Sequence, residues 1–253
     1  MINGVLLDLS GTIYTGETAL PGALEALELL RLARIPVRYL TNSSRSPRRA
    51  IFHKLCAIGL VCREEEILTA PQAIRAYLQE HKLTPWLLVH PAIEEEFADL
   101  CGPAPDTVVL GDAADGFSYA NLNQAFRLLL AGARLLAVGD NRYFREVEGL
   151  SLDAGPFVAA LEYAADCEAI ILGKPSAAFF HTAADQLGCR AGEVLMIGDD
   201  VFSDINGALR AGLKAALVQT GKYRAGDEQR IAAPGACVCP NLLSAIEGIL
   251  QDR

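Results

Sequence analysis

Short runs of branched apolar residues alternate along this chain with longer segments of helical period, and this alternation limits the folds open to it. Val5–Leu7 and Val194–Ile197 are two such runs, and Val37–Leu40 is a further strand signal that contains one arginine, Arg38. A run that is apolar at every position indicates a strand buried on both faces, as in parallel sheets covered by helices. The alternation therefore predicts an α/β fold with a doubly wound, Rossmann-like parallel sheet.

Residues that begin and end helices stand between these runs. Ser46 occupies an N-cap position before Pro47 at the first helical position, and Gly59 follows where the helix should stop. Ser176 and Gly188 bound a second segment in the same way. Each pair predicts a crossover helix between two strands.

The middle of the chain carries strand signals of its own. They are Leu87–Val89, Val108–Leu110 and Leu135–Val138, separated by helical segments. The alternation of strands and helices seen in the N-terminal part begins again with a strand signal at Ala169–Leu172. We therefore expect an inserted α/β cap domain over residues 81–168, within a core domain formed by residues 1–80 and 169–253.

Composition narrows the partners and the location. The net charge is -9, so a surface that collects nucleic acid or anionic lipid is not expected. The longest apolar segment, Leu128–Val138, is interrupted by Arg134 and is too short to span a bilayer. Seven cysteines lie without the paired spacing of a disulfide framework or a zinc site, which predicts reduced thiols and a cytoplasmic location.

Polar residues that follow predicted strands are the candidates for chemistry, because ligands of open α/β sheets bind beyond the carboxyl ends of strands. Four clusters do so. They are Asp8 in LLDLSGT, Thr41 and Asn42 in YLTNSS, Lys174 in GKP, and Asp199 in GDDVFSD. Singly, each has a structural explanation: Lys174 as a solvated lysine, and Asp199, Asp200 and Asp204 as an acidic start to a helix. Those explanations do not account for the order in which all four clusters occur along the chain.

Together the clusters supply the parts of a phosphoryl-transfer site. Asp8 can attack phosphorus with one carboxylate oxygen and bind a cation with the other. Asp199 and Asp204 complete an oxygen ligand set suited to Mg²⁺. Thr41 can donate a hydrogen bond to a phosphoryl oxygen, and Lys174 can neutralise charge on that group and on Asp8. The predicted ligand is a small phosphorylated substrate; GKP is not a nucleotide-binding P-loop, since it lacks the upstream glycine and the following Ser or Thr.

These four motifs resemble those of the haloacid-dehalogenase superfamily, in the group with a large α/β (NagD-like) cap. The segments FSYANLNQAF, LDAGPFVAALEYA and QTGKYRAGDE resemble the subgroup of phosphatases for phospholysine, phosphohistidine and inorganic pyrophosphate. The resemblance implies a magnesium-dependent phosphatase with an aspartyl-phosphate intermediate, and pairing of two copies through their caps. The predicted phosphate-binding residues are Asp8, Leu9, Ser10, Thr41, Asn42 and Lys174; the predicted metal ligands are Asp8, the Ser10 carbonyl, Asp199 and Asp204; and Asp8 and Lys174 are the predicted catalytic residues.

Ser10 departs from the pattern of the superfamily, most of whose phosphatases carry a second Asp at that position as a general acid and base. A serine hydroxyl cannot fill that role near neutral pH. We therefore expect substrates whose leaving groups need little protonation, such as pyrophosphate or a phosphoramidate, to react faster than alkyl phosphate esters.

Two questions stay open at this level. The cap residues Tyr119, Asn121, Asn123, Asn141, Arg142 and Tyr143 either select the substrate or serve cap turns and interfaces, whereas His90 is expected to be structural. The same motifs are also compatible with a phosphotransferase or mutase, and with a protein that binds a phosphorylated ligand but turns it over weakly.

Overall fold

The computed structural model describes residues 1–146 and 149–251 and divides them between two compact units. Residues 147–148 and 252–253, which the expected domain ranges include, lie outside this description. The first unit contains residues 1–41, 48–68 and 174 onward, and the second unit contains residues 42–47 and 69–173.

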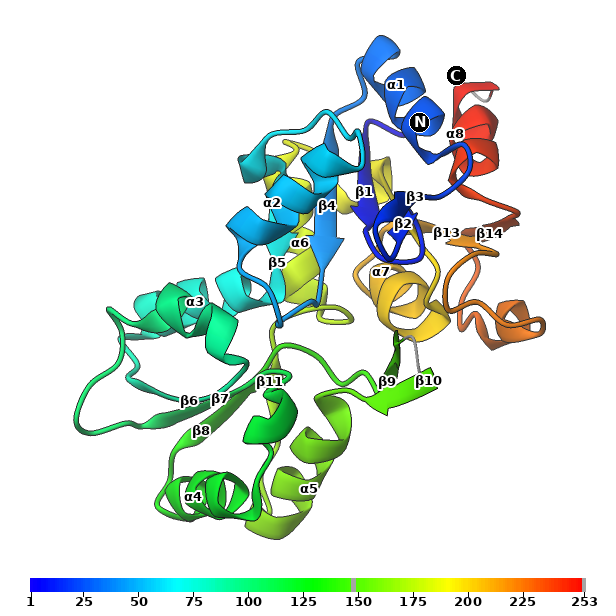
Figure 1. Ribbon diagram of the computed structural model, residues 1–253. Helices are drawn as coiled ribbons and strands as arrows, with labels where there is room; N and C mark the ends of the chain where they lie inside the picture. The colour runs from blue at the N-terminus through cyan, green and yellow to red at the C-terminus, as the bar shows by residue number, and fades with distance from the viewer. Residues whose placement is uncertain (147–148, 252–253) are drawn as a thin grey trace. The chain divides into compact units, whose positions relative to one another are not determined.

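The first unit is built on a six-stranded sheet of order β14-β13-β12-β1-β4-β5 (Figure 1). Strands β1, β4, β12, β13 and β14 pair in parallel with their neighbours. The bounds are β1 Gly4–Asp8, β4 Val37–Thr41, β5 Ile67–Thr69, β12 Val194–Gly198, β13 Lys214–Val218 and β14 Ala236–Cys239. The doubly wound parallel sheet predicted from the apolar runs is confirmed.

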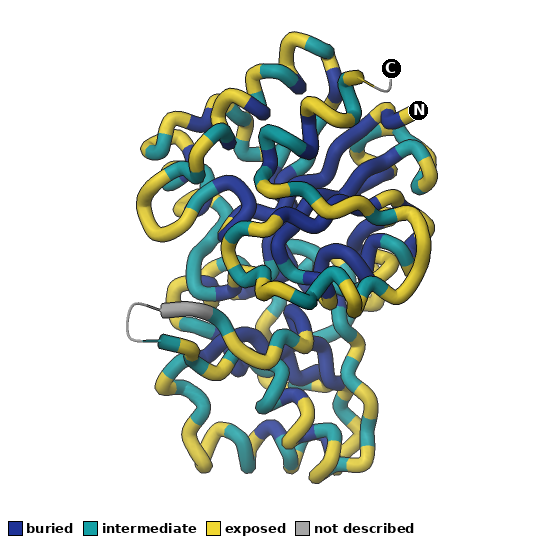
Figure 2. The backbone as a smooth tube through the Cα atoms, turned by 90° about the vertical axis from the view of Figure 1, so that its right-hand side faces the viewer, coloured by how far each residue is buried: buried dark blue, intermediate teal, exposed yellow. Residues whose placement is uncertain are grey.

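Helices cover both faces of this sheet because alternate strand residues point to opposite sides. Val5 and Leu7 are buried with apolar residues of α1 (Ala23–Leu32), α2 (Arg48–Ala57) and α8 (Leu242–Gln251). Leu6 is also fully buried, on the face that α6 (Ala177–Gln186) and α7 (Gly207–Arg210) cover. In Figure 2 the strands accordingly form the dark-blue interior of the unit.

The second unit has a four-stranded sheet of order β11-β8-β7-β6, in which all neighbours are parallel. Its helices bury one apolar face each against these strands. The bounds are β6 Pro85–Leu88, β7 Thr107–Leu110, β8 Arg134–Ala137, β11 Ile170–Ile171, α3 Ala70–His81, α4 Tyr119–Leu130 and α5 Gly155–Ala165. Two antiparallel pairs complete the described strands: β2 Tyr14–Thr15 with β3 Thr18–Ala19, and β9 Tyr143–Glu146 with β10 Gly149–Leu152.

The limits of the two units differ from the expected domain limits at both junctions. Residues 69–80 were expected in the core domain, but Ala70, Ile74 and Leu78 of α3 are buried in the hydrophobic cluster of the second unit. The strand signal near residue 170 was also expected in the core domain, whereas β11 pairs with β8 in the second sheet. An apolar helix face and a two-residue strand do not encode which of two similar sheets they join, so only the packing decides.

Two other expectations concern membranes and thiols. No helix in the described ranges has the length and apolar character needed to cross a membrane. The seven cysteines are free thiols in the structure.

Candidate active site

The site lies at the point where the strand order of the six-stranded sheet reverses. From β1 the chain adds β4 and β5 on one side and later adds β12, β13 and β14 on the other. In open α/β sheets, ligands bind at such a point, in the crevice beyond the carboxyl ends of the strands. Asp8 is the last residue of β1 and Asp199 directly follows β12, so two of the predicted carboxylates flank the reversal.

Lys174 reaches this crevice by a route that the sequence rule did not foresee. The strand before it, β11, belongs to the second sheet, so Lys174 does not follow a strand of the sheet that carries Asp8. Its ammonium nevertheless forms an ion pair with Asp8 Oδ1 and a second one, at 2.7 Å, with Asp204 Oδ1. The side chain of Lys174 is only 4% exposed, so these carboxylates replace its hydration.

A short helical turn after β12 brings Asp204 to the same point. Residues 201–206 form one turn of π-helix, and such turns occur frequently at functional sites. Asp200 caps this turn, because its Oδ1 accepts hydrogen bonds from the amides of Phe202 and Ser203. Asp204 Oδ2 accepts a hydrogen bond from the Asp200 amide at 3.1 Å. The sequence did not separate Asp200 from Asp199 and Asp204. In the structure, the Asp200 amide holds the carboxylate of Asp204 in place.

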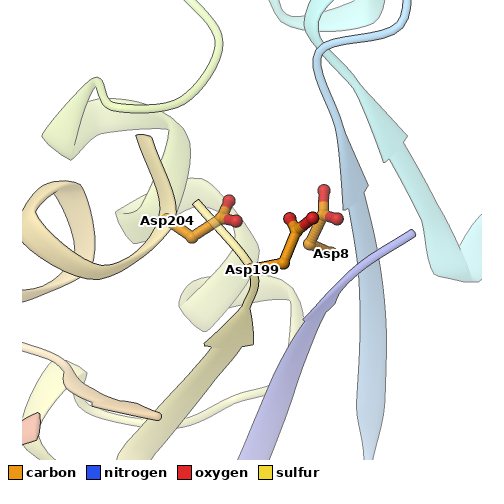
Figure 3. A group of neighbouring side chains, drawn as sticks. All are labelled: Asp8, Asp199 and Asp204. Atoms are coloured by element: carbon orange, nitrogen blue, oxygen red, sulfur yellow. The ribbon is translucent and has the colours of Figure 1, made fainter. Parts of the chain in front are cut away.

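Asp8, Asp199 and Asp204 point toward one another, as Figure 3 shows, with one oxygen of each within 4.8 Å of the others. All three are buried. Burial, followed by the charges of Asp8 and Asp204, raises the pKa of Asp199 well above its usual range. Burial also raises the pKa of Asp204 to about 7, with Asp8 and Asp200 adding to the effect and Lys174 opposing it.

The ammonium of Lys174 keeps its charge in the same buried cluster. Burial by itself lowers the pKa of its ammonium, but the carboxylates of Asp204 and Asp8 outweigh burial and raise that pKa. Lys174 therefore stays charged, while the three carboxylates of the cluster would carry, once ionised, more negative charge than one ammonium can balance. A buried cluster with this imbalance is suited to a cation.

The donor set decides which cation fits. Carboxylate oxygens are hard ligands that suit Mg²⁺, and the cluster contains neither the thiolates nor the imidazoles of zinc and copper sites. The three predicted carboxylates thus lie close enough together to hold one metal ion. The carbonyl of Ser10, the fourth predicted ligand, belongs to the turn that directly follows β1.

Glycines let the backbone approach the carboxylates closely. Gly11 has φ +92°, and a Cβ atom at this position would overlap Asp199 Oδ2. A Cβ atom on Gly198 would likewise overlap the carboxylate of Asp204. The absence of a side chain at Gly11 therefore lets the turn after β1 lie against the carboxylate of Asp199.

The remaining predicted residues end or directly follow β1 and β4. Thr41 ends β4, the neighbour of β1, and is buried. Ser10 is exposed and forms an isolated bridge with Tyr14, whereas the side chain of Leu9 is fully buried in the hydrophobic core. Leu9 can therefore offer only its backbone to a phosphate. Asn42 belongs to the second unit and its position relative to Asp8 stays untested.

Sequence reasoning missed three residues that contact this site. Thr220 Oγ1 donates a hydrogen bond to the Gly11 carbonyl at 2.6 Å, and the Lys222 amide donates one to Asp199 Oδ2, also at 2.6 Å. Gly221 lies between them. These residues lie two to four positions beyond Val218, the last residue of β13, so a search that extended past the first residue after each strand would have included them.

The polar residues singled out in the second unit make local contacts. Asn121 Nδ2 donates to the Gly116 carbonyl at 2.9 Å, and His90 Nδ1 accepts from the Ala92 amide at 3.1 Å, which is the structural role expected for His90. Tyr119 is 82% exposed. A role in selecting the substrate stays a prediction for the six cap residues.

Comparison with known families and proteins is consistent with this geometry. Residues 5–101 match the model of the haloacid dehalogenase-like hydrolase family, and residues 171–245 match a HAD-hydrolase-like model. The human haloacid dehalogenase-like hydrolase domain-containing protein 2 is 42% identical over 250 residues, which cover 99% of this chain and 96% of that protein. The human phospholysine phosphohistidine inorganic pyrophosphate phosphatase is 38% identical over 256 residues, covering 99% of this chain and 95% of that protein.

Solved structures resemble the whole chain. The 4-nitrophenylphosphatase of Thermotoga maritima superposes with a TM-score of 0.90 at 26% identity, covering 97% of each chain. A glycerol phosphate phosphatase of Mycobacterium tuberculosis, solved in complex with magnesium, gives a TM-score of 0.83 at 26% identity, covering 96% of this chain and 76% of the other.

Proposed function

This chain belongs to the haloacid dehalogenase-like hydrolase family and is a phosphatase. On that premise we propose that it depends on magnesium and that Asp8 accepts the phosphoryl group of the substrate as a transient covalent intermediate. The observation that carries the proposal is the buried ion pair between Lys174 and Asp8 at the centre of three converging carboxylates. A carboxylate meets strong repulsion from a phosphate dianion unless cations lie between them. Lys174 supplies one positive charge, and a cation held by the acidic cluster would supply the rest.

Magnesium would be held by Asp8 and Asp199, with Asp204 near enough to contribute, and relieves the excess of negative charge. When bound, it supplies Lewis-acid stabilisation of charge on the phosphoryl oxygens. The magnesium-bound structure of the glycerol phosphate phosphatase supports this choice of ion.

The chain's own residues then perform two displacements. An oxygen of Asp8 forms a bond to phosphorus while the bond from phosphorus to the leaving group breaks, and the leaving group departs with the electron pair. Lys174 holds Asp8 in position and balances charge, while the Thr41 hydroxyl donates to a phosphoryl oxygen. Water next attacks phosphorus, the bond from phosphorus to the Asp8 oxygen breaks, and inorganic phosphate leaves with the oxygen and the protons of that water, which regenerates the Asp8 carboxylate.

We propose small compounds with P–O–P or P–N bonds as substrates, pyrophosphate, phospholysine and phosphohistidine among them. The printed name of the human relative that is 38% identical supports this class. The absence of a carboxyl at position 10 supports it independently, because such leaving groups depend least on a general acid. A cytoplasmic location and pairing of two copies through the second unit remain further proposals.

The proposal is tested by trapping the intermediate. We expect protein incubated with Mg²⁺ and pyrophosphate, then quenched in acid, to gain one phosphoryl group on the peptide that contains Asp8, as measured by mass spectrometry. The Asp8→Asn variant is the matched control and should gain none. Phosphorylation at another residue, or none in a protein that turns over substrate, would contradict the proposal.

Release of inorganic phosphate separates a phosphatase from a transferase of the same family. We expect one phosphate released per substrate consumed with water as the only acceptor. Turnover that required an added alcohol or sugar would instead indicate a phosphotransferase or mutase.

A further inference from the structure

The segment that follows β13 contacts the acidic cluster from the side opposite β4. Its residue Thr220 donates a hydrogen bond to the Gly11 carbonyl, and the Lys222 amide donates one to Asp199 Oδ2, both at 2.6 Å. The segment is itself anchored, since the Gln219 amide donates to the Cys239 carbonyl at 3.0 Å. It therefore ties the turn after β1 to the carboxylate after β12.

Asp199 is enclosed by two glycines in this arrangement. A Cβ atom on Gly221 would overlap Asp199 Oδ2 and would come within 2.5 Å of Gly11 Cα. Gly221 also has φ +57°, a conformation that side chains disfavour. The close approach places the Lys222 amide against the carboxylate, and this contact requires the backbone of residue 222 and not its side chain.

The side chain of Lys222 has a separate electrostatic effect. Its Nζ lies 3.5 Å from Asp200 Oδ2, and the side chain is 32% exposed. With all groups ionised, Asp8, Asp199, Asp200 and Asp204 together with Lys174 and Lys222 carry a formal charge of -2, which one divalent cation balances. Without Lys222 the same group carries -3.

We infer that Lys222 is a positioning residue of the active site, whose amide orients Asp199 and whose ammonium limits the negative charge met by the cation and the phosphoryl group. The inference rests on the proposed magnesium-dependent phosphatase function. It adds a second lysine to the site and assigns a task to the segment after β13.

Removing the ammonium of Lys222 should change the affinity for Mg²⁺ and the affinity for the substrate in opposite directions. Lys222→Met retains the amide and removes the positive charge, so Mg²⁺ should bind more tightly and an anionic substrate more weakly. At the distances of neighbouring groups, partly screened by water, each change is expected to be about three- to tenfold. A residue that merely supported the fold would weaken both ligands together when replaced.

The experiment measures Mg²⁺ binding by titration calorimetry, without substrate, and the KM for p-nitrophenyl phosphate at saturating Mg²⁺. We expect the Mg²⁺ dissociation constant to fall and the KM to rise in Lys222→Met, and Lys222→Arg to restore both. Lys214→Met is the matched control, because Lys214 is an exposed lysine at the start of β13. Lys222→Gln is tested in parallel in case the methionine variant does not fold.

The outcomes distinguish this inference from the proposed function. Weaker binding of both ligands in the Lys222 variants, or changes no larger than those in Lys214→Met, would overturn the inference and leave the phosphatase proposal standing. Wild-type protein that binds no Mg²⁺ would overturn both. If Mg²⁺ binding shifts as expected but the wild type hydrolyses nothing, the charge-balancing role holds and the proposed reaction fails.

Discussion

The two units are built on the same type of sheet, yet among the described residues only the first unit assembles a cluster of three buried carboxylates. In the second unit the described strands join in chain order, β6, β7, β8 and β11, all on one side. In the first unit the order reverses at β1, so loops leave β1 and β12 in opposite directions. A parallel sheet alone does not form a ligand crevice; the reversal of strand order does.

The acidic residues at the strand ends show the same contrast. Asp112 follows β7 by two residues and is buried, but it accepts a hydrogen bond from the Ala114 amide and pairs with Arg45 at 2.5 Å. Its charge is thus balanced within the second unit. Asp8, Asp199 and Asp204 share Lys174 and crowd one another. Unbalanced charge distinguishes a site for chemistry from a structural ion pair.

The largest expected effect follows from replacing the acid at each of these two strand ends. Asp8→Asn removes the nucleophile and should lower kcat by about 10⁴-fold or more. Asp112→Asn removes a structural ion pair and should leave kcat within about threefold at temperatures where the protein stays folded, while lowering Tm. Steady-state hydrolysis of pyrophosphate and thermal unfolding measure both. Equal losses of kcat in the two variants would break the distinction between the strand ends.

A smaller effect is expected from adding a carboxyl at position 10. General acid–base catalysis contributes about 10²–10⁴-fold, so Ser10→Asp should raise kcat/KM for an alkyl phosphate ester by about tenfold or more, with a smaller gain for pyrophosphate. Ser10→Asn is the matched control, because it has a similar shape but no titratable proton. If both variants gained equally, or if the wild type hydrolysed both substrates at similar rates, the absent general acid would not explain selectivity.

The smallest effect concerns pH and magnesium. In the metal-free protein the pKa of Asp204 is about 7 and that of Asp199 is raised, whereas unfolded aspartates titrate near 3.9. The folded state therefore holds protons that the unfolded state has lost, and its stability should fall as pH rises through about 7.

Mg²⁺ replaces those protons as the balancing charge, so the rise in Tm on adding it should be larger at pH 8 than at pH 6. We expect a difference of about 2–4 °C, which corresponds to about 1 kcal/mol in a protein of this size. Asp199→Asn should reduce the difference and Asp112→Asn should preserve it. A rise in Tm that is independent of pH in the wild type would show that the carboxylates are not short of positive charge.

The sequence determined the type of fold and most of the site. Runs that are apolar at every position predict buried parallel strands, and the polar residue that ends or follows such a run lies at the carboxyl edge of the sheet. Asp8 and Asp199 were found in this way, and Thr41 was found after a strand signal that contains one arginine. The signal is local, because a strand and its next residue are neighbours in the chain. Lys222 lies four residues beyond the end of β13, so a rule limited to the residue after a strand does not select it.

The tertiary structure alone decided which sheet each segment joins and which charges meet. The helix at residues 70–81 and the strand at residues 170–171 joined the second unit, although their sequences suit either sheet. Lys174 contacts Asp8 across 166 residues of chain, and the Lys222 amide contacts Asp199 through a backbone group that no residue type reveals. Contacts of this kind depend on how the whole chain packs, because the energy that selects them comes from many residues distant in sequence.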